Sequence, residues 1–396
     1  MSEHDGPRGP LAGLIVVDLS RALAGPHAGM MLGDLGARVI KVESPGGDDS
    51  RGWGPPFLPG SDGREHASYF LSCNRNKESI VVDLKAEEGR ALLGRLVARA
   101  DVLIENFRPG VLDRLGFSVP RLHEINAGLV ILSITGFGHD GPEGTRPGYD
   151  QIAQGEGGIM SVTGPSKDEP TRAGLPVGDI LAGMYGAYGV LAALRERDVT
   201  GRGQVVRTSL LAAVVGAHAY QGTRYTVAGE VPETTGNYHP SICPYGLYRA
   251  EDGFVQIAVG SDALWQRMAP EFGLDRPEWA RNRERVHEHE AVNAAVDAAF
   301  SRHPAAEVLA TLAELGVPAG KVRDFAEVYS WEQTRSQGLL IEVDHAALGR
   351  IRLPGPPLRF ESSGRETGRA IHAAPPVLDE HGDAVRRWLS EDNGRG

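Results

Sequence analysis

Cysteine is nearly absent from the sequence, which contains only Cys73 and Cys243 among its 396 residues. Two cysteines are too few for the disulfide framework of a small secreted protein. Neither the cysteines nor the histidines follow a metal-binding spacing such as C-x-x-C or H-E-x-x-H. The sequence therefore predicts neither a disulfide framework nor a metal site.

Positive charge is also in short supply. The chain has 41 Lys and Arg residues against 52 Asp and Glu residues, and its net charge is −11. This balance argues against a general nucleic-acid or anionic-membrane partner, although a local basic pocket for a phosphorylated ligand is compatible with it. No uninterrupted apolar run reaches the about 20 residues that a bilayer span requires, and the polar start MSEHDGPRGP does not resemble a signal peptide. We expect a cytoplasmic protein with no nucleic-acid or membrane partner.

The sequence does contain a regular alternation of apolar, β-rich runs and helical segments. LIVVDL (14–19), the helical segment 24–36 and ARVIKVE (37–43) predict one β-α-β unit. The pattern continues with strands at 79–84, 101–107 and 129–137 and a helix at 87–100. Such alternation predicts a doubly wound α/β domain with a parallel sheet. A chain of this length, with 41% hydrophobic and 23% charged residues, is expected to form two soluble domains or one with a substantial insertion.

The composition changes after residue 227. Residues 228–246 are rich in Gly, Pro and Thr and are expected to form a linker and loop. Residues 247–260 predict a hairpin, and helical segments follow to about residue 315. This second half indicates a smaller domain.

The first strand and helix are not joined by a known nucleotide-binding motif. Their connection, SRALAGPHAG (20–29), does not fit G-x-G-x-x-G, and no P-loop G-x-x-x-x-G-K-[ST] occurs. Glu43, at the end of the second strand, resembles the acid that binds ribose in nicotinamide enzymes. Without the glycines, however, the sequence argues against a nicotinamide enzyme and against a nucleoside triphosphatase.

One ionisable residue, Asp179, lies in an otherwise small and apolar stretch, GLPVGDILAGMYGAYGVLAAL (174–194). A carboxylate in such surroundings costs several kcal/mol unless hydrogen bonds or charges compensate it. Two interpretations are open: Asp179 is the N-cap of a helix and accepts its free N–H groups, or it is a catalytic acid. Gly183, Gly186 and Gly189 each weaken such a helix by about 1 kcal/mol, which suggests that another backbone or a ligand comes close.

Several motifs, taken together and in order, resemble those of the family III CoA-transferases. They are LSRALAGPHAGMMLGDLGARVIKVESPGGDDSRGWGPP, NRNKESIVVDLK, ENFRPGVLDRLGF, RPGYDQIAQGEGGIMSVTG and VGDILAGMYGAYGVLAAL. The resemblance runs from about residue 10 to the C-terminus and includes TGRGQVVRTSLL, GVPAG and LPGPPLRF. This family includes formyl-CoA transferase and carnitine CoA-transferase, and the 2-methylacyl-CoA racemases are its relatives.

The resemblance implies an α/β fold with a Rossmann-like large domain, a smaller α+β domain and an interlocked homodimer. The implied limits are 1–200 for the first part of the large, CoA-binding domain, 201–227 for a linker helix and 228–325 for the small domain. Residues 326–396 then form a return linker and the last part of the large domain. The implied substrates are an acyl-CoA and a small carboxylic acid, with no tightly bound cofactor and no metal.

In this family the aspartate at the position of Asp179 is a covalent nucleophile, so the resemblance favours the catalytic interpretation. The apolar surroundings would remove the hydration that makes a carboxylate a weak nucleophile. A helix N-terminus at this point would keep the carboxylate ionised. The implied reaction passes through mixed anhydrides and an aspartyl-CoA thioester.

The family positions also imply binding residues. Those on the CoA side, where three phosphate groups favour basic side chains, are Arg21, Ala24, Val82, Lys85, Asn106, Phe107, Arg108 and Arg114. Those of the substrate pocket are Leu23, Tyr149, Asp150, Gly236 and His239. Arg75 and Lys77 are interpreted equally well as plain surface residues.

Three positions depart from the relatives. Leu23 replaces a Gln that helps formyl-CoA transferase hold a very small acid, and Ser44 replaces a basic residue, which argues against formate or oxalate. Tyr149 replaces a racemase His, which removes one of the two groups that racemisation needs. Residues 239–260 resemble transferases of dicarboxylic acids such as succinate, glutarate or malate. We therefore expect CoA transfer to an organic acid, with a 2-methylacyl-CoA racemase and a non-catalytic acyl-CoA-binding protein as alternatives.

Overall fold

The computed structural model describes residues 9–391, which divide into two compact units. The larger unit extends to Ile159 and also includes Ala173–Ala228 and the chain from Gln333 onward. The smaller unit consists of Met160–Arg172 and Gly229–Glu332. This division assigns residues 160–172 to the smaller unit, and it assigns residues 201–227, where a linker helix is expected, to the larger one.

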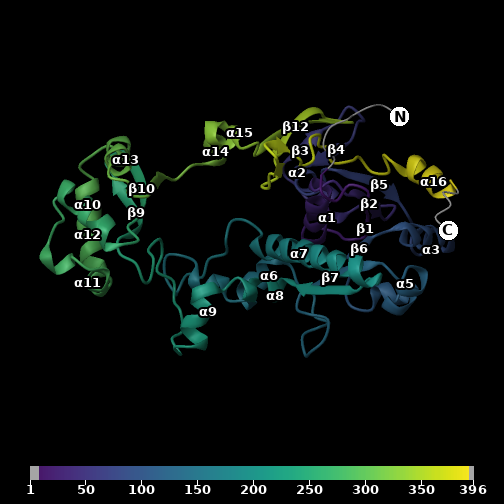
Figure 1. The fold of residues 1–396 in the computed structure, drawn as a ribbon, viewed down its shortest axis with the longest axis horizontal. Helices are drawn as coiled ribbons and strands as arrows, with labels where there is room; N and C mark the ends of the chain where they lie inside the picture. Colours follow the sequence, from purple (N-terminus) through teal and green to yellow (C-terminus); the bar gives the residue numbers. More distant parts are fainter. Residues whose placement is uncertain (1–8, 392–396) are drawn as a thin grey trace. The chain divides into compact units, whose positions relative to one another are not determined.

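A six-stranded parallel sheet lies at the centre of the larger unit (Figure 1). Its strands, in spatial order, are β5 (Lys77–Val81), β2 (Arg38–Glu43), β1 (Ile15–Asp18), β6 (Val102–Glu105), β7 (Val130–Thr135) and β8 (Val205–Ser209). In chain order this arrangement is 3-2-1-4-5-6, which is that of dinucleotide-binding folds. The predicted Rossmann-like sheet is confirmed. The strand order reverses between β1 and β6, and sheets of this type bind ligands beyond the carboxyl ends of the strands at that reversal.

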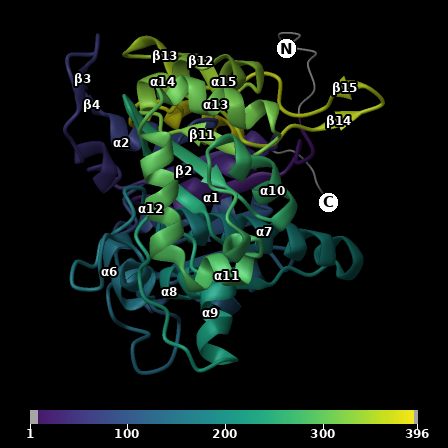
Figure 2. The same cartoon turned by 90° about the vertical axis from the view of Figure 1, so that its left-hand side faces the viewer.

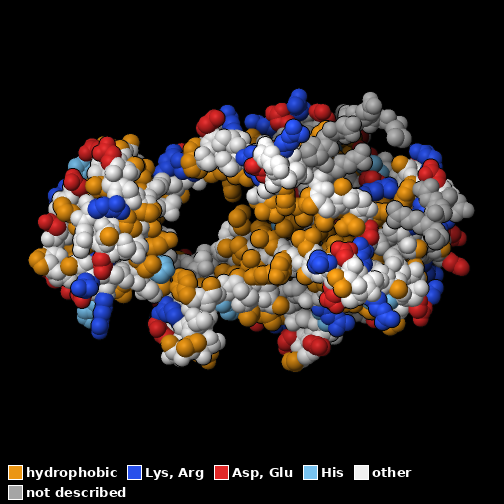
Figure 3. Space-filling view, viewed as in Figure 1, with side chains coloured by type: hydrophobic (Ala, Val, Ile, Leu, Met, Phe, Trp, Pro, Cys, Tyr) orange, Lys and Arg blue, Asp and Glu red, His pale blue; other side chains and the backbone are white. Residues whose placement is uncertain are grey.

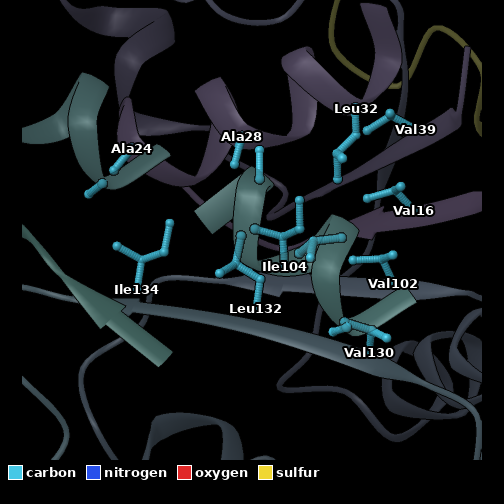
Figure 4. Packing of buried hydrophobic residues seen from close by; sticks show 14 of the residues in the cluster. Val16, Ala24, Ala28, Leu32, Val39, Val102, Ile104, Val130, Leu132 and Ile134 are labelled. Atoms are coloured by element: carbon cyan, nitrogen blue, oxygen red, sulfur yellow. The ribbon is translucent and has the colours of Figure 1, made fainter. Parts of the chain in front are cut away.

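Each face of the sheet has its own hydrophobic core, because successive strand residues point to opposite faces. On one face, Val16 of β1 packs in the cluster that includes residues of α1 (Ala24–Asp34) and α7 (Val177–Thr200). Figure 4 shows this cluster with Ala24, Ala28 and Leu32 of α1 beside the strand residues. On the other face, Val17 packs with α3 (Glu87–Arg99), α5 (Val119–Ile125) and α16 (Gly382–Ser390).

Shorter elements complete the larger unit. The helices are η1 (Asp49–Gly52), α2 (Ser68–Leu71), α4 (Val111–Arg114), α6 (Asp150–Glu156), α8 (Leu210–Gly216) and α9 (Ala219–Thr226), with η2 (Ile159–Val162) and α15 (Glu332–Ser336) at its boundaries. The paired strands are β3 (Phe57–Pro59) with β4 (Glu65–Ala67), β12 (Leu340–His345) with β13 (Gly349–Pro354), and β14 (Glu361–Ser362) with β15 (Arg365–Glu366). Val343 and Leu353 of β12 and β13 pack on Phe70 of α2. The last part of the chain therefore belongs to the same unit as the first.

The smaller unit is an α+β structure, as expected. Its antiparallel sheet has the order β11 (Ala319–Lys321), β10 (Gly253–Ala258) and β9 (Tyr245–Ala250). The helices are α10 (Asp262–Glu271), η3 (Pro277–Trp279), α11 (Asn282–His287), α12 (His289–Phe300), α13 (Ala305–Glu314) and α14 (Phe325–Ser330). Figure 2 looks onto α10 to α13. Their shared core includes Tyr248, Trp265, Trp279 and Phe300.

Helix α7 is unusually apolar. By length and composition alone it could cross a membrane, and it is the one such helix in residues 9–391. Its uninterrupted apolar run, residues 180–194 between Asp179 and Arg195, is shorter than the about 20 residues of a bilayer span. In the structure α7 packs on α1, β7, β8 and α8 as a core helix of the α/β unit. Its outer face nevertheless exposes Met184, Tyr185, Tyr188 and Leu191, and hydrophobic side chains gather over this helix in Figure 3.

Candidate active site

Two loops meet where the strand order reverses, one following β1 and one following β6. Asn106 joins them: its Nδ2 donates to the Arg21 carbonyl oxygen and its Oδ1 accepts from the Arg21 N–H, both at 2.8 Å. The Arg21 guanidinium lies 5.8 Å from the centre of the Phe107 ring. Leu23 and Ala24, both buried, begin α1 directly after this loop. The structure therefore brings together five of the residues that the sequence assigned to binding.

A buried network of charges lies beneath the first loop. Lys77 contacts Asp18 at 2.9 Å, and Lys41 contacts Asp48 at 2.8 Å, with all four side chains at most 1% exposed. The Lys41 ammonium also donates to the carbonyl oxygen of Ser20 at 2.9 Å. Oδ1 of Asp48 accepts from the backbone N–H of Ala22. Buried charges without partners would be strongly unfavourable, so the network fixes the shape of this loop.

The pKa values in the network follow from these contacts. Burial raises the pKa of Asp18, but Lys77 and Lys41 together outweigh burial and leave that pKa below its ordinary value. The same holds for Asp48, where Lys41 is the compensating charge. The interpretation of Arg75 and Lys77 as surface residues is wrong, because both are buried and Arg75 pairs with Asp34. The sequence did contain a signal for buried charges, because Asp18 in LIVVDL and Lys41 in ARVIKVE are charged residues inside apolar strands.

The other residues assigned to CoA lie near the same edge of the sheet but differ in exposure. Val82 directly follows β5 and is buried in the core. Lys85, Arg108 and Arg114 are exposed, with Arg114 at the end of α4. Exposed cations at the carboxyl edge are suited to binding phosphate groups.

Asp179 is the third residue of α7, and the N-cap position belongs to Pro176. The prediction that Asp179 caps its own helix is therefore wrong. The cap comes from Asp150, whose Oδ1 accepts from the N–H of Gly178 at 2.8 Å and from the N–H of Asp179 at 3.2 Å. Because Asp150 accepts from these two N–H groups, they are not available to the Asp179 side chain.

The electrostatics of Asp179 also differ from expectation. Burial, and then the negative charge of Asp150, raise the pKa of Asp179 to about 7. The expected lowering of this pKa by the helix start is not found, because burial, and then the charge of Asp150, raise the pKa instead. Asp179 is thus a carboxylate whose basicity is well above that of an exposed aspartate.

Tyr69 of α2 is a neighbour of Asp179 that the sequence analysis missed. Burial, and then the charge of Asp179, raise the pKa of Tyr69 to about 12. The Tyr69 ring also packs edge-on against Trp53, with centroids 4.9 Å apart. No spacing could reveal this residue, since α2 and α7 are far apart in the sequence and only the fold brings Tyr69 within range of the Asp179 charge.

The glycines of α7 are explained by close packing. A Cβ atom on Gly183 would lie 2.7 Å from the Ala24 carbonyl oxygen and 3.0 Å from Cδ2 of His27. One on Gly189 would lie 2.5 Å from Cγ1 of Val206. The predicted close approach of another backbone is confirmed at Gly183, where the neighbour is α1, whereas at Gly189 the neighbour is a side chain of β8. This packing fixes the helix that carries Asp179.

The remaining residues assigned to the substrate pocket lie in different parts of the chain. Tyr149 precedes Asp150, and its side chain is 66% exposed. Gly236 and His239 belong to the smaller unit, where the His239 ring stacks on Tyr245 with centroids 5.1 Å apart. Burial lowers the pKa of His239. Gly236 has a φ of +61°, a conformation that glycine adopts readily.

In residues 9–391, no group of three or more His, Cys, Asp or Glu side chains is placed to hold a metal ion.

Comparison with known proteins agrees with this fold. The family model "CoA-transferase family III" matches residues 11–382. A succinate–glutarate CoA-transferase of Agrobacterium fabrum is 38% identical, over 93% of this chain and 95% of its own. An acetyl-CoA:oxalate CoA-transferase of Acetobacter aceti is also 38% identical, over 96% of both chains. The crystal structure of a CAIB/BAIF family protein from Brucella suis superposes with a TM-score of 0.85 at 41% identity, covering 96% of this chain and all of that one.

The chain therefore belongs to the family III CoA-transferases. It is an acyl-CoA:carboxylate CoA-transferase, and its substrates are CoA thioesters and carboxylic acids.

Proposed function

We propose that this enzyme transfers CoA through covalent intermediates on Asp179. The observation that carries the proposal is the state of this side chain: a single carboxylate at the start of an apolar helix, with a pKa raised to about 7 by burial and by Asp150. A raised pKa makes the ionised form a better nucleophile, and partial burial limits the hydration that would weaken it.

The proposed reaction has four steps. The Asp179 carboxylate attacks the thioester carbonyl of the donor, forming a mixed anhydride and expelling CoA thiolate. The thiolate attacks the aspartyl carbonyl, which gives an aspartyl-CoA thioester and releases the donor acid. The acceptor carboxylate then attacks this thioester, forming a second anhydride and expelling thiolate again. Attack of the thiolate on the acceptor acyl carbon yields the new acyl-CoA and regenerates Asp179.

Tyr69 is a candidate hydrogen-bond donor for the reacting group, since the charge of Asp179 reaches its hydroxyl. Because the pKa of Tyr69 is raised to about 12 by burial and then by Asp179, its hydroxyl keeps its proton at neutral pH. Tyr69 is therefore suited to donate to oxygen atoms that gain negative charge during the transfer. We propose Tyr69 as the residue that faces the reacting carbonyl group.

We further propose that CoA binds at the reversal point of the sheet. The loops joined by Asn106 and Arg21 would contact the pantetheine arm and the adenine ring of CoA. Val82 would lie beside that adenine ring. Lys85, Arg108 and Arg114 are exposed at this edge and would pair with the phosphate groups.

The acceptor is proposed to be a dicarboxylic acid. Succinate, glutarate and oxalate, which appear in the names of the two relatives, are all dicarboxylic acids. Leu23 and Ser44 argue against a very small acid, but the relative named for oxalate places oxalate in any test panel. His239, on the smaller unit, is the proposed contact of the acceptor carboxylate, with Gly236 shaping its loop.

A homodimer is also proposed, with the protein in the cytoplasm. Met184, Tyr185, Tyr188 and Leu191 form an exposed apolar face on α7, and Tyr188 is 73% exposed. A contiguous apolar face of this kind is typical of an interaction surface. Light scattering that gives the mass of one chain at micromolar concentration would contradict the dimer.

The central experiment is to trap the intermediate. The enzyme is incubated with succinyl-CoA without an acceptor, quenched in acid and digested, and the peptide that contains Asp179 is analysed by mass spectrometry. A mass increase of CoA on that peptide, absent from Asp179→Asn, is expected. A peptide that stays unmodified while the enzyme transfers CoA would exclude the covalent route.

The racemase alternative is tested separately. In deuterium oxide without an acceptor, a (2S)-methylacyl-CoA should keep its α-proton, because Tyr149 cannot replace the missing histidine base. Rapid deuterium incorporation with inversion, monitored by NMR, would show that the enzyme racemises 2-methylacyl-CoA and would contradict this expectation.

A further inference from the structure

Gln154 is a fully buried polar side chain in α6, with an exposed fraction of 0%. Its Nε2 donates to Oδ2 of Asp150 at 2.7 Å and to the carbonyl oxygen of Leu175 at 3.3 Å. Its Oε1 accepts from the N–H of Ala173 at 2.8 Å. A buried amide with unmet hydrogen bonds is costly, so these three bonds define one position for the side chain.

The partners of Gln154 share a location in the chain. Ala173 is the residue at which the chain enters the larger unit from the smaller one, and Leu175 lies just before α7 begins at Val177. Asp150 in turn accepts from the first turn of α7, at Gly178 and Asp179. Gln154 thus connects α6, the segment that enters the unit, and the first turn of α7.

We propose that Gln154 is a positioning residue for the nucleophile: it fixes both Asp150 and the segment 173–175, so that α7 presents Asp179 in one orientation. This inference rests on the proposed role of Asp179. Gln154 is buried and acts only through Asp150 and the backbone, and no contact with substrate is required of it.

Loss of the Gln154 amide has a definite electrostatic consequence. Asp150 would lose the donor to Oδ2 and become free to turn away from α7. The N–H groups of Gly178 and Asp179 would then be available to the Asp179 carboxylate. The negative charge of Asp150 would also lie farther from that carboxylate. Both changes favour the ionised form, so the pKa of Asp179 should fall toward the value of an ordinary aspartate.

Other charged groups around Asp179 do not reverse this direction. Tyr69 of α2 is neutral, since burial and Asp179 raise its pKa to about 12. His27 of α1, which packs near Gly183, is neutral because burial, and then Arg75 and Lys77, lower its pKa to about 4. Asp34 of α1 pairs with Arg75, and Glu156 of α6 pairs with Arg146. Helix α8 and strand β7 contain no ionisable side chain, and β8 contributes only Arg207.

A matched control exists in the same unit. Asn126 also makes three hydrogen bonds through its amide, in this case all to backbone: it donates to the carbonyl oxygens of Val97 and Ala100 and accepts from the N–H of Gly128. Asn126 follows α5 at the opposite, amino-terminal edge of the sheet. Asn126→Ala should therefore lower stability without altering the site.

The test compares Gln154→Ala with Asn126→Ala in the full chain. Hydrogen exchange of the Gly178 and Asp179 amides, resolved by fragmentation of the peptide 173–182, should be roughly tenfold faster in Gln154→Ala only. Titration of the Asp179 carboxyl by ¹³C NMR, assigned with Asp179→Asn, should show a pKa lower by roughly half a unit or more. Neither readout requires turnover, so failure of the proposed chemistry and failure of this inference are distinguishable.

Activity adds a third readout. Gln154→Ala should lower kcat roughly tenfold and leave the KM for acyl-CoA within about twofold, because only the nucleophile is displaced. If Gln154→Ala does not fold, Gln154→Met retains the length of the side chain and removes its amide hydrogen bonds without adding a charge. It should show the same faster exchange. Wild-type exchange at Gly178 and Asp179 in the folded variant, or equal changes in Asn126→Ala, would overturn the inference.

Discussion

Asp150 and Asp179 are two carboxylates linked through one helix end. Oδ1 of Asp150 accepts from the backbone N–H of Asp179 at 3.2 Å, and after burial its charge is what raises the pKa of the Asp179 side chain to about 7. One carboxylate thus takes the hydrogen bonds that the other would otherwise receive. At neutral pH Asp179 is close to half ionised, and transfer activity should rise with pH through this range.

Asp150→Asn should move the acid limb of the kcat/KM profile to lower pH, by roughly one unit. The Asn side-chain oxygen can still accept from Gly178 and Asp179, but the negative charge is gone. The profile is measured with a saturating acceptor between pH 5 and 9. Glu156→Gln, which removes an exposed carboxylate from the other end of α6, is the control. An unshifted limb in Asp150→Asn would contradict the role of this charge.

Asp179→Asn should abolish transfer and change stability in a pH-dependent way. The pKa of Asp179 is raised from 3.8 to about 7 by burial and Asp150, so the folded state binds its proton more tightly than the unfolded state. Stability contributed by this residue is then present at low pH and is lost as pH rises through about 7. Because Asn resembles the neutral acid, the melting temperature of Asp179→Asn relative to wild type should increase from pH 5 to pH 8.

The difference in melting temperature between Asp179→Asn and wild type removes the contributions of the other titrating groups, because both proteins contain them. A difference in melting temperature that is constant with pH would show that the pKa of Asp179 is not raised. Transfer above about one hundredth of the wild-type rate would exclude Asp179 as the covalent nucleophile.

Arg114→Ala should raise the KM for acyl-CoA and change kcat much less. A phosphate contact remote from the reacting carbon binds the ground state and the transition state equally. Arg121→Ala is the matched control, since Arg121 is exposed on the neighbouring helix α5 and pairs with Glu124. Steady-state kinetics that give the same KM for both variants would make Arg114 a plain surface charge.

Gly183→Ala should destabilise the protein by about 1–3 kcal/mol, because the new methyl group meets the backbone of Ala24. Gly94 provides the opposite case. It lies inside α3 with nothing within 4 Å of the added Cβ, so Gly94→Ala should stabilise the fold by up to about 1 kcal/mol. Urea unfolding monitored by circular dichroism measures both. Equal effects of the two substitutions would mean that α1 and α7 are not in tight contact.

The parallel sheet could be predicted because its strands are buried on both faces and therefore appear as continuous apolar runs. LIVVDL and ARVIKVE become β1 and β2 with only the end residues changed. The prediction for β5 was a few residues too late, at 79–84 rather than Lys77–Val81. Lys77 and Glu78 look like loop residues in sequence, but in the edge strand β5 Lys77 is buried against Asp18 and Glu78 pairs with Arg38.

The environment of the nucleophile was less predictable. Asp179 itself is visible as one charge in an apolar stretch, but its cap comes from Asp150, 29 residues away, and Tyr69 comes from a separate helix. Local spacing describes hydrogen bonds within one turn of a helix, and it says nothing about donors and acceptors that a fold brings in from elsewhere. The pKa of Asp179 depends on those distant groups, so the sequence indicated the residue and not its ionisation.

The buried charges beneath the first loop also limit how this enzyme can be re-engineered. The loop after β1 is held by groups from separate strands and segments, with Lys41 on the Ser20 carbonyl oxygen and Asp48 on the Ala22 N–H. Grafting residues 19–24 alone onto another Rossmann-like scaffold would transfer the sequence of the loop but not its conformation. A functional transplant must carry Lys41 and Asp48 as well, together with the Asp18–Lys77 pair, so the transferable module is a set of residues scattered over more than one strand.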